Sequence, residues 1–366
     1  MEENIMMFDK TPSALYSLWK AFRSRKSIYS PDVTYPIIHS VRKGVTINAS
    51  HLKAFYKICD IIQTDFLHIL YPFTLVYPYI MRVMGSQKMP VSMFKTLNTR
   101  NSIVMHRPIR HDERLDIDCY NGAPRIISKG LEIDVTSVVY AGSETVWENI
   151  TTYFYPGKFG PEKGVYNAPK LEPIDHAPII KEWYLPAKDR FKFARISGDS
   201  NGIHYGSFYA RMMGFKRDFA QPIRVAAQCV SSLPRNNGEI HGWLEDVVAN
   251  CFAPASTVGM DCPVRLDFYL KGPVYYQSTL ILKNIRTAYG NRFDLYCRGN
   301  EKPVICGMLY NRRAKEFVKR VSNEDKRTAV INQYKRADFY ERLCLYLSTA
   351  DLRDVFEEIE LESYYH

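Results

Sequence analysis

A carboxylate and an imidazole stand five positions apart in the segment SGDSNGIH, which spans residues 197–204. On a regular helix, at about 100° per residue, Asp199 and His204 would point roughly 140° apart and would share no face. Gly198 and Gly202 are typical of turns, and a turn lets two side chains at this spacing converge. A carboxylate and an imidazole that face one small volume can take one proton and give another. The pattern therefore predicts a loop that holds an acid–base site.

The alternative interpretation is a purely structural turn. In that case the turn caps a helix that begins near Ser207, and His204 is half-buried without a chemical role. The surrounding sequence favours the acid–base interpretation. The segment FKFARI (191–196) has the pattern of an apolar strand that approaches the loop, and SFYARMMGF (207–215) predicts a helix after it. A strand, a glycine-rich loop and a helix in this order are typical of a functional site.

The eight residues also resemble the signature S/T-G-D-x-N-P-I/L-H of the MaoC-like, or hydratase 2, dehydratases. In that family the signature is followed by a segment that ends in Gly-Phe, which is similar to Gly214-Phe215 here. The layout of the chain is similar to the double hot-dog members, in which a hot-dog without the motif precedes one that carries it. The resemblance implies an α+β fold with two long helices, each wrapped by a curved antiparallel sheet, and extra N- and C-terminal helices.

The resemblance also implies a reaction and roles for residues. The reaction is the reversible removal of water from an (R)-3-hydroxyacyl thioester of CoA or acyl carrier protein, which gives a trans-2-enoyl thioester without a cofactor. Asp199 and His204 match the two catalytic positions of the family. Asn201 matches the residue that holds the loop, and Ser197 and Gly198 complete the loop support. The neutral-range pKa of histidine suits this proton transfer.

Two positions depart from the family pattern. Gly202 replaces the usual proline, which should loosen the loop without removing a reactive side chain. Gln221-Pro222 replaces a His-Gly pair whose glycine amide polarises the thioester carbonyl, and proline has no N–H. An oxyanion donor contributes roughly 3 kcal/mol to a barrier, so its loss matters. Three groups are candidate replacements: the amide of Ile223, the carboxamide of Gln221 and the side chain of Arg224.

Three functions therefore stay open. The first is an active 3-hydroxyacyl-thioester dehydratase, or enoyl-thioester hydratase, of fatty-acid or polyketide-type lipid metabolism. The second is a catalytically silent subunit that binds acyl thioesters or assembles a pathway, and Pro222 favours it. The third is a hot-dog thioesterase, which also uses a carboxylate but lacks the D-x-N-x-x-H loop. The complete Asp199–His204 pair favours the first.

The rest of the chain predicts two similar halves. Helices are expected at 50–60, 66–84 and 222–233, and strands at 101–121, 125–142, 144–157, 263–288, 291–299 and 302–312. In each half an alternating strand meets a break, HRPI in the first and LKGP in the second, and then continues as another strand, which indicates an internal duplication.

These elements divide the chain into five expected segments. They are an N-terminal helical segment (1–30), a hot-dog without the motif (31–160), a linker rich in proline and glycine (161–178), a hot-dog with the motif (179–318) and a C-terminal helical extension (319–366). A basic helix at 11–26 and further helices after 323 belong to the two terminal segments. The C-terminal helices are candidates for a homodimer contact.

Composition limits the partners. The net charge of +10 favours anionic partners such as CoA phosphates or an acidic carrier protein, and Arg107, Arg110, Arg211 and Arg224 are candidate contacts. No common nucleic-acid motif is present, so we expect no nucleic-acid partner. Eight cysteines without a C-x-x-C pair predict no metal site and reduced thiols in a cytoplasm, and the first residues do not resemble a signal peptide. The apolar run 66–84 predicts a buried helix, not a membrane span.

Overall fold

The computed structural model describes residues 4–13, 29, 30, 33, 35–93, 96–163, 171–199, 201–234, 262–287 and 290–310. The first half contains β1 (Asn4–Phe8), β2 (Ile38–Thr46), α2 (Ala49–Cys59), α3 (Tyr71–Met84), β3 (Leu97–Met105), β4 (Arg114–Asn121), β5 (Arg125–Ile127), β6 (Gly130–Ala141) and β7 (Glu144–Pro156). The second contains β8 (Ile179–Leu185), α4 (Arg190–Ser197), the 3-10 helix η2 (Gly202–His204), α5 (Ser207–Met212), α6 (Pro222–Ser231), β9 (Val264–Leu270), β10 (Ser278–Thr287), β11 (Gly290–Cys297) and β12 (Ile305–Tyr310).

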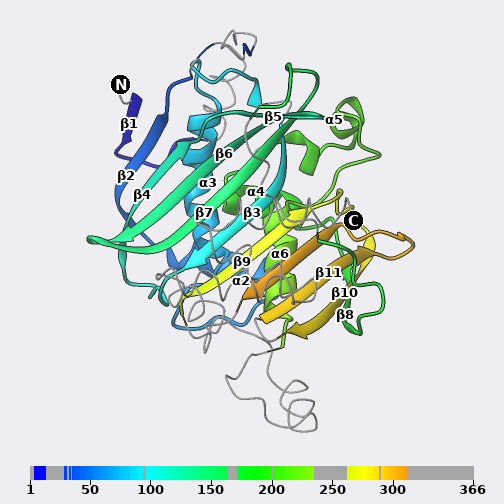
Figure 1. The fold of residues 1–366 in the computed structure, drawn as a ribbon. Coiled ribbons are helices and arrows are strands. Elements are labelled where there is room, and N and C mark those ends of the chain that lie inside the picture. Colours follow the sequence, from blue (N-terminus) through cyan, green and yellow to red (C-terminus); the bar gives the residue numbers. More distant parts are fainter. Residues whose placement is uncertain are drawn as a thin grey trace, which may run out of the picture.

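The two halves form one curved sheet, shown in Figure 1. The strands follow the order β1-β2-β4-β6-β7-β3-β9-β12-β11-β10-β8, and β5 pairs with β6. Outward from the central pair β3–β9, the order is β7-β6-β4-β2 on one side and β12-β11-β10-β8 on the other. These are equivalent positions in the two halves, so the sheet is palindromic. The topology thus supports the internal duplication predicted from the two strand breaks, which lie between β3 and β4 and between β9 and β10.

The pairing is antiparallel except at one edge. The central strands pair with Ile103 opposite Leu266, and every neighbour from β2 to β8 along the order is antiparallel. Of the described strands only β1 pairs in parallel, with Asn4 opposite Ile38 of β2. The strands predicted within 101–157 and 263–312 are confirmed where the structure describes them, but β1 and β8 at the two edges and β2 beside β1 were not foreseen. Nearly all side chains of β1 and β8 are half-exposed or exposed, so these two strands lack a strong apolar alternation.

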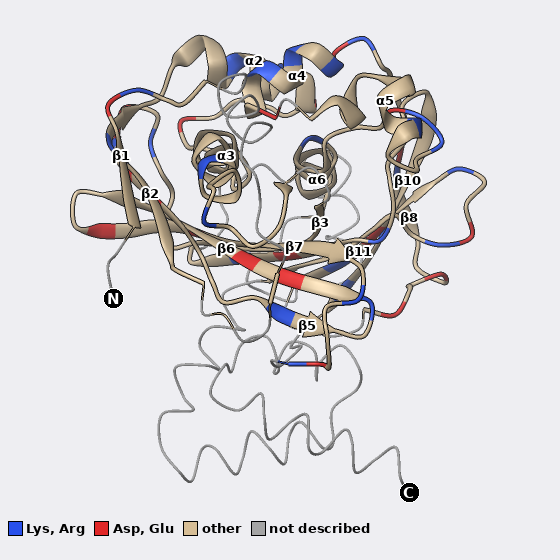
Figure 2. Ribbon diagram, turned by 90° about the horizontal axis from the view of Figure 1, so that it is seen from above, with Lys and Arg blue, Asp and Glu red and all other residues tan. Residues whose placement is uncertain are grey.

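Two helices occupy the hollow of the sheet. Figure 2 shows α3 and α6 end-on and side by side within the curve of the sheet. In the same view α2 and α4 lie on the side of these two helices that faces away from the sheet. All but three of the residues of α3 are buried, and in α6 only Pro222 is not. One continuous apolar core joins both halves and includes Phe55, Trp147, Phe193 and Phe268. The two halves therefore share one core. The loop after α4 in the second half is thereby held against side chains of the first half.

One predicted helix boundary and one predicted strand are wrong. The predicted helix 66–84 begins only at Tyr71, because the preceding residues pair elsewhere: Phe66 bridges to Arg110, and the Leu67 amide donates to Ile109 O at 2.8 Å. Pro72 then suits the first turn of the helix.

The segment FKFARI is not a strand but most of the helix α4. Phe193 and Ile196 are three positions apart and both are buried, which matches a helical face. The hydroxyl of Ser197 also donates to Phe193 O at 2.9 Å, one helical turn back. The alternation of the six residues was therefore a misleading signal.

Several expectations lie outside the described residues, namely the helix at 11–26 beyond residue 13, the centre of the 161–178 linker and everything after residue 310. Among the residues that are described, no helix is long and apolar enough to cross a membrane.

Candidate active site

The loop that carries Asp199 begins at a glycine with a left-handed backbone. Helix α4 ends at Ser197, and Gly198 has φ 70°, a conformation that favours glycine. A Cβ at this position would also lie 3.0 Å from Cγ of Pro78 in α3. The Asp199 amide then donates to the Ser197 hydroxyl at 3.2 Å. Ser197 and Gly198 thus turn the chain so that Asp199 points away from its own helix.

Asn201 closes the turn. Its amide donates to Oδ1 of Asp199 at 3.0 Å, and its own Oδ1 accepts from the Ile203 amide at 3.3 Å. Asn201 is thereby the N-cap of the short 3-10 helix that carries His204. Both contacts are Asx-type hydrogen bonds between residues two apart, so the five-residue spacing closes into a compact loop.

Gly202 stands against an aromatic ring. A Cβ on Gly202 would lie 2.9 Å from Cδ1 of Tyr209, which belongs to α5. The space that a proline ring would need at this position is therefore occupied by Tyr209. This contact gives a physical reason for glycine where the family pattern has proline.

Asp199 and His204 come together as the sequence predicted. Oδ2 of Asp199 lies 3.3 Å from Nε2 of His204, and the residues are only 7% and 5% exposed. Nδ1 of His204 is 2.9 Å from the Phe219 carbonyl oxygen, which can only accept, so Nδ1 carries a proton. Nε2 is therefore the nitrogen available for chemistry, and it faces the carboxylate.

The electrostatics favour an ionised carboxylate. Burial by itself raises the pKa of Asp199, but the charge and hydrogen bond of His204, the Asn201 amide and the Tyr77 phenol together lower the pKa below its ordinary value. A carboxylate beside Nε2 is favourable only if a proton lies between the two atoms. Asp199 and His204 therefore share one transferable proton between Oδ2 and Nε2.

The pair opens into a cavity of about 710 Å³. Asp199, Asn201 and His204 line it on one side, and the first residues of α6 line it on another. Its apolar walls come from both halves, namely from Phe73, Met81, Met93 and Leu97 of the first and Phe193, Phe219, Leu270 and Val274 of the second. An elongated apolar molecule with a polar head has the matching chemistry.

The start of α6 offers two of the three predicted carbonyl-binding groups. Gln221 is 2% exposed; its Oε1 accepts from the Tyr276 hydroxyl at 3.3 Å, while its Nε2 has no hydrogen-bond partner among the described residues. Ile223 follows Pro222 in the first turn, where backbone amides have no intrahelical acceptor. Both residues line the cavity. The helix start therefore presents N–H groups even though Pro222 has none.

Arg224 does not fit the role predicted for it. Its side chain is buried, 2% exposed, and does not line the cavity. One helical residue beyond Ile223, it points away because neighbouring positions on a helix lie about 100° apart. Arg224 is thus separate from the groups that the loop and helix bring together.

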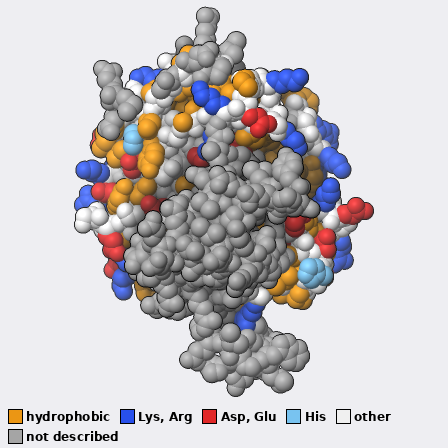
Figure 3. Space-filling view, viewed as in Figure 1, with side chains coloured by type: hydrophobic (Ala, Val, Ile, Leu, Met, Phe, Trp, Pro, Cys, Tyr) orange, Lys and Arg blue, Asp and Glu red, His pale blue; other side chains and the backbone are white. Residues whose placement is uncertain are grey.

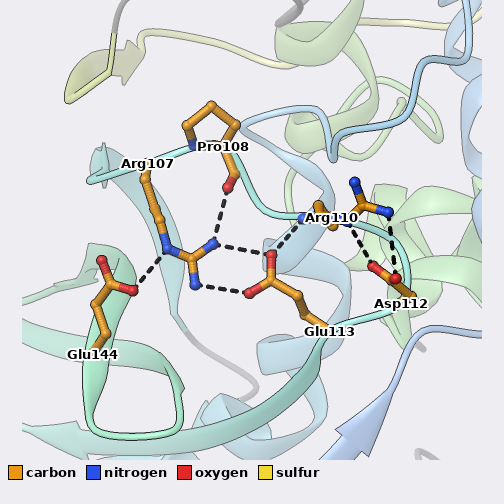
Figure 4. A network of polar contacts seen from close by, with 6 residues as sticks. All are labelled: Arg107, Pro108, Arg110, Asp112, Glu113 and Glu144. Atoms are coloured by element: carbon orange, nitrogen blue, oxygen red, sulfur yellow. Dashed lines mark hydrogen bonds and ion pairs between the residues drawn. The ribbon is translucent and has the colours of Figure 1, made fainter.

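The other candidate arginines also lie outside the cavity lining. Figure 4 shows Arg107 held by Glu113 and Glu144, at 2.8 Å each, and Arg110 paired with Asp112 at 3.0 Å. Arg211 donates to the Lys216 carbonyl oxygen. In Figure 3 the basic side chains outside the grey atoms are interspersed with acidic ones. The positive charge is thus dispersed on this face.

Sequence reasoning missed two contributors to the site. The Phe219 carbonyl fixes the histidine tautomer, and Tyr77 of the first half lines the cavity with Asp199 and helps to lower the pKa of its carboxyl. A backbone carbonyl leaves no residue-type signal. Tyr77 lies in the apolar run that predicted a buried helix, and no pattern within that run distinguished it from the neighbouring aromatic residues.

Solved structures of known proteins share this architecture. The HtdX protein of Mycobacterium tuberculosis superposes with a TM-score of 0.59 at 18% identity, over 75% of this chain and 99% of that one. A MaoC-like dehydratase from Phytophthora capsici superposes with a TM-score of 0.58 at 13% identity, over 76% of this chain and 95% of that one. The fold is that of the double hot-dog, MaoC-like dehydratases.

The sequence comparison agrees with the fold. The chain is 23% identical over 226 residues to 3-hydroxyacyl-thioester dehydratase X of Mycobacterium tuberculosis, which covers 61% of this chain and 79% of that protein. No protein-family model matches the chain. The resemblance to MaoC-like proteins that the SGDSNGIH motif indicated is confirmed.

Proposed function

We propose that this protein catalyses the reversible dehydration of (R)-3-hydroxyacyl thioesters to trans-2-enoyl thioesters. The observation that carries the proposal is the buried Asp199–His204 pair, with Oδ2 and Nε2 3.3 Å apart at the wall of a large, mostly apolar cavity. The relatives named as dehydratases support the same reaction class. The residues 31–160 and 179–318 are proposed as its two hot-dog domains.

Asp199 and His204 together can accept and donate the two protons that an elimination of water requires. The Asp199 carboxylate takes the proton from Cα, and the C–H electrons form the double bond. The C3–O bond breaks as Nε2–H of His204 protonates the departing hydroxyl, which leaves as water. The pair is then a carboxylic acid and a neutral imidazole, and transfer of one proton from Oδ2 to Nε2 restores it. Hydration follows the same steps in reverse.

The developing charge on the thioester oxygen needs a donor. The Ile223 amide and the Gln221 carboxamide lie in the same cavity as Asp199 and His204. The positive end of the α6 dipole reinforces them. Tyr276 donates to Oε1 of Gln221, and Nε2 has no hydrogen-bond partner in the described part of the chain, so it can donate to a carbonyl. We assign the carbonyl-binding role to these two groups in place of the missing amide at Pro222.

The acyl chain then extends toward the first half. Phe73 and Met81 of α3 and Leu97 of β3 provide the apolar wall on that side. Burial of each methylene contributes about 0.8 kcal/mol, so the wall favours long chains over short ones. The first half lacks the motif but shapes the binding site.

A catalytically silent acyl-thioester-binding subunit is the second candidate. The specific observation in its favour is Pro222 at the first turn of α6, where it removes one amide donor. The intact Asp199–His204 geometry argues for catalysis, because a binding protein has no need of a buried acid–base pair.

The test is an enoyl-CoA hydration assay that follows the loss of the conjugated thioester absorbance. We expect activity in the natural protein and a fall of roughly 10²–10⁴-fold in Asp199→Asn and in His204→Ala. Thermal unfolding of both variants serves as the control that they are folded. Activity that survives both substitutions contradicts the mechanism, binding of acyl-CoA without turnover identifies the silent subunit, and release of free thiol identifies a thioesterase.

A further inference from the structure

A chain of polar side chains lies on the core face of the sheet, between β7 and β3. Nδ2 of Asn149 donates to the Thr151 hydroxyl at 2.8 Å, and that hydroxyl donates to Oδ1 of Asn101 at 3.0 Å. Nδ2 of Asn101 in turn donates to Oδ1 of Asn98 at 3.1 Å. The first three residues are 0% exposed, on a face that also bears the core residue Ile103. Polar groups at this depth are costly unless they are hydrogen-bonded, so the order of these bonds is well defined.

A β-bulge brings the end of this polar chain to the cavity. Asn98 and Asn101 are three positions apart, so on a regular strand their side chains would lie on opposite faces. The register of β3 against β7 shifts by one residue between Asn98 and Arg100. The shift places Asn98 on the same face as Asn101, to which it is bonded. Asn98 thereby lines the cavity that also contains Asp199 and His204.

Asn98 offers the cavity a hydrogen-bond donor. Its Oδ1 is occupied by Asn101, and its Nδ2 makes no hydrogen bond within the described part of the chain. Rotating the amide by 180° would set its NH₂ group against the NH₂ group of Asn101, so the orientation is fixed. Each of the three bonds is donated in the direction of Asn98, and bonds in such a series polarise one another. The chemical complement of this group is an acceptor oxygen.

The cavity wall around Asn98 is apolar. Leu97 of the same strand, Met93 before it, Met81 of α3 and Leu270 of β9 all line the cavity. The thioester oxygen is assigned to the start of α6, so the N–H of Asn98 is left for another oxygen. A ligand that covers this donor without an acceptor leaves it unpaired, which costs about 1–3 kcal/mol.

We propose that Asn98 is a specificity residue for acyl chains that carry an acceptor oxygen, such as a keto, hydroxyl or ether group, beyond C3. The inference rests on the proposed function, in which the acyl chain lies along this first-half wall. The N–H of Asn98 donates to the oxygen of such a chain, whereas a plain alkyl chain leaves the donor unpaired. The half without the motif thus selects the substrate.

The test compares trans-2-enoyl-CoA substrates of one chain length in the hydration assay. One substrate is plain, and the others carry a single keto group at successive carbons from C6 outward. We expect Asn98→Leu to lower the ratio of kcat/KM for the best-placed keto chain over the plain chain about tenfold. Both substrates are measured on one sample, so the ratio does not depend on how much of the variant is folded. A ratio that Asn98→Leu leaves unchanged at every keto position overturns the inference.

Thr99→Val is the matched control. Thr99 lines the same wall, but its hydroxyl already donates to the Thr152 carbonyl oxygen at 3.3 Å. Valine keeps the β-branched shape, so we expect the ratio of the natural protein. A fall as large as that in Asn98→Leu contradicts the assignment.

Thr151→Val tests the polar chain from a position outside the cavity lining. It removes the hydroxyl that donates to Asn101, so the Asn98 amide is less firmly oriented. We expect the ratio to fall about threefold, and an unchanged ratio contradicts the orienting role of the buried residues.

Equilibrium binding separates this inference from the proposed function. Saturated acyl-CoAs, plain or with the keto group, cannot be hydrated, so their Kd values report binding alone. A keto-over-plain ratio of affinities that falls in Asn98→Leu supports the inference even if the natural protein hydrates nothing, and that inactivity refutes the dehydration. Turnover with ratios that Asn98→Leu leaves unchanged refutes the inference and leaves the dehydration standing.

Discussion

Among the residues that the structure describes, each half buries one histidine near its central helix, and the two histidines are bonded differently. His68 precedes α3; its Nδ1 accepts from the Leu70 amide at 3.2 Å, and its Nε2 donates to the Ser231 hydroxyl at 3.1 Å. His204 is the last residue of η2, before α5 and α6; its Nδ1 is bonded to a carbonyl, but its Nε2 faces Asp199 at a cavity.

Burial alone does not give a histidine an acid–base role. Both nitrogens of His68 are used by neutral partners, and burial lowers its pKa to about 3, so it stays uncharged. His204 is also buried, but its Nε2 lies 3.3 Å from the Asp199 carboxylate. A buried histidine becomes an acid–base group only where a counter-charge and an open cavity meet it.

The largest expected effect comes from replacing each of the two histidines by glutamine in turn. His204→Gln should lower the hydration rate by roughly 10²–10⁴-fold and change the melting temperature little. His68→Gln should do the opposite, because it leaves the Leu70 amide buried without its acceptor at a cost of about 1–3 kcal/mol. Paired measurements of kcat and thermal unfolding check this split, and a large loss of kcat in His68→Gln contradicts it.

Acid should destabilise the fold through His68. Its pKa is about 3 when folded and about 6.5 when unfolded, so the unfolded chain binds one more proton between these values. The contribution is complete above pH 6.5 and falls by about 1.4 kcal/mol per pH unit as the pH drops toward 3. Urea unfolding from pH 7 to 4 measures the slope, and His68→Gln should lose that part of it. Equal slopes in both proteins contradict the assignment.

The smallest effect concerns the loop. Gly202→Pro restores the family residue but meets the Tyr209 ring, so we expect a loss of about 1 kcal/mol in unfolding free energy and a few-fold loss of activity. Tyr209→Ala in the same chain should relieve most of the added cost of the proline. A double-mutant cycle on thermal stability measures the coupling, and additive effects would show that the contact does not matter.

Much of the fold followed from local pattern. Alternation predicted the inner strands, and the breaks at Pro108 and Pro273 predicted where they end. The start of α6 followed from Pro222. Local pattern failed for 66–70 and 191–196, where the chain's partners lie far away: Phe66 pairs with Arg110, and α4 packs against the first-half core. A short apolar run is compatible with either a helix or a strand, and its pattern alone does not decide between them.

The candidate site, like the fold, was predictable from the sequence only in part. The sequence by itself determined that Asp199 and His204 share one loop, because glycine and asparagine at fixed spacing select a turn whose hydrogen bonds join residues only two apart. Only the tertiary structure decided which histidine nitrogen faces the carboxylate, that Arg224 lies outside the cavity lining and that Tyr77 of the first half lines the cavity with Asp199. Those contacts join distant segments, and their geometry is set by the packing of two halves around one core.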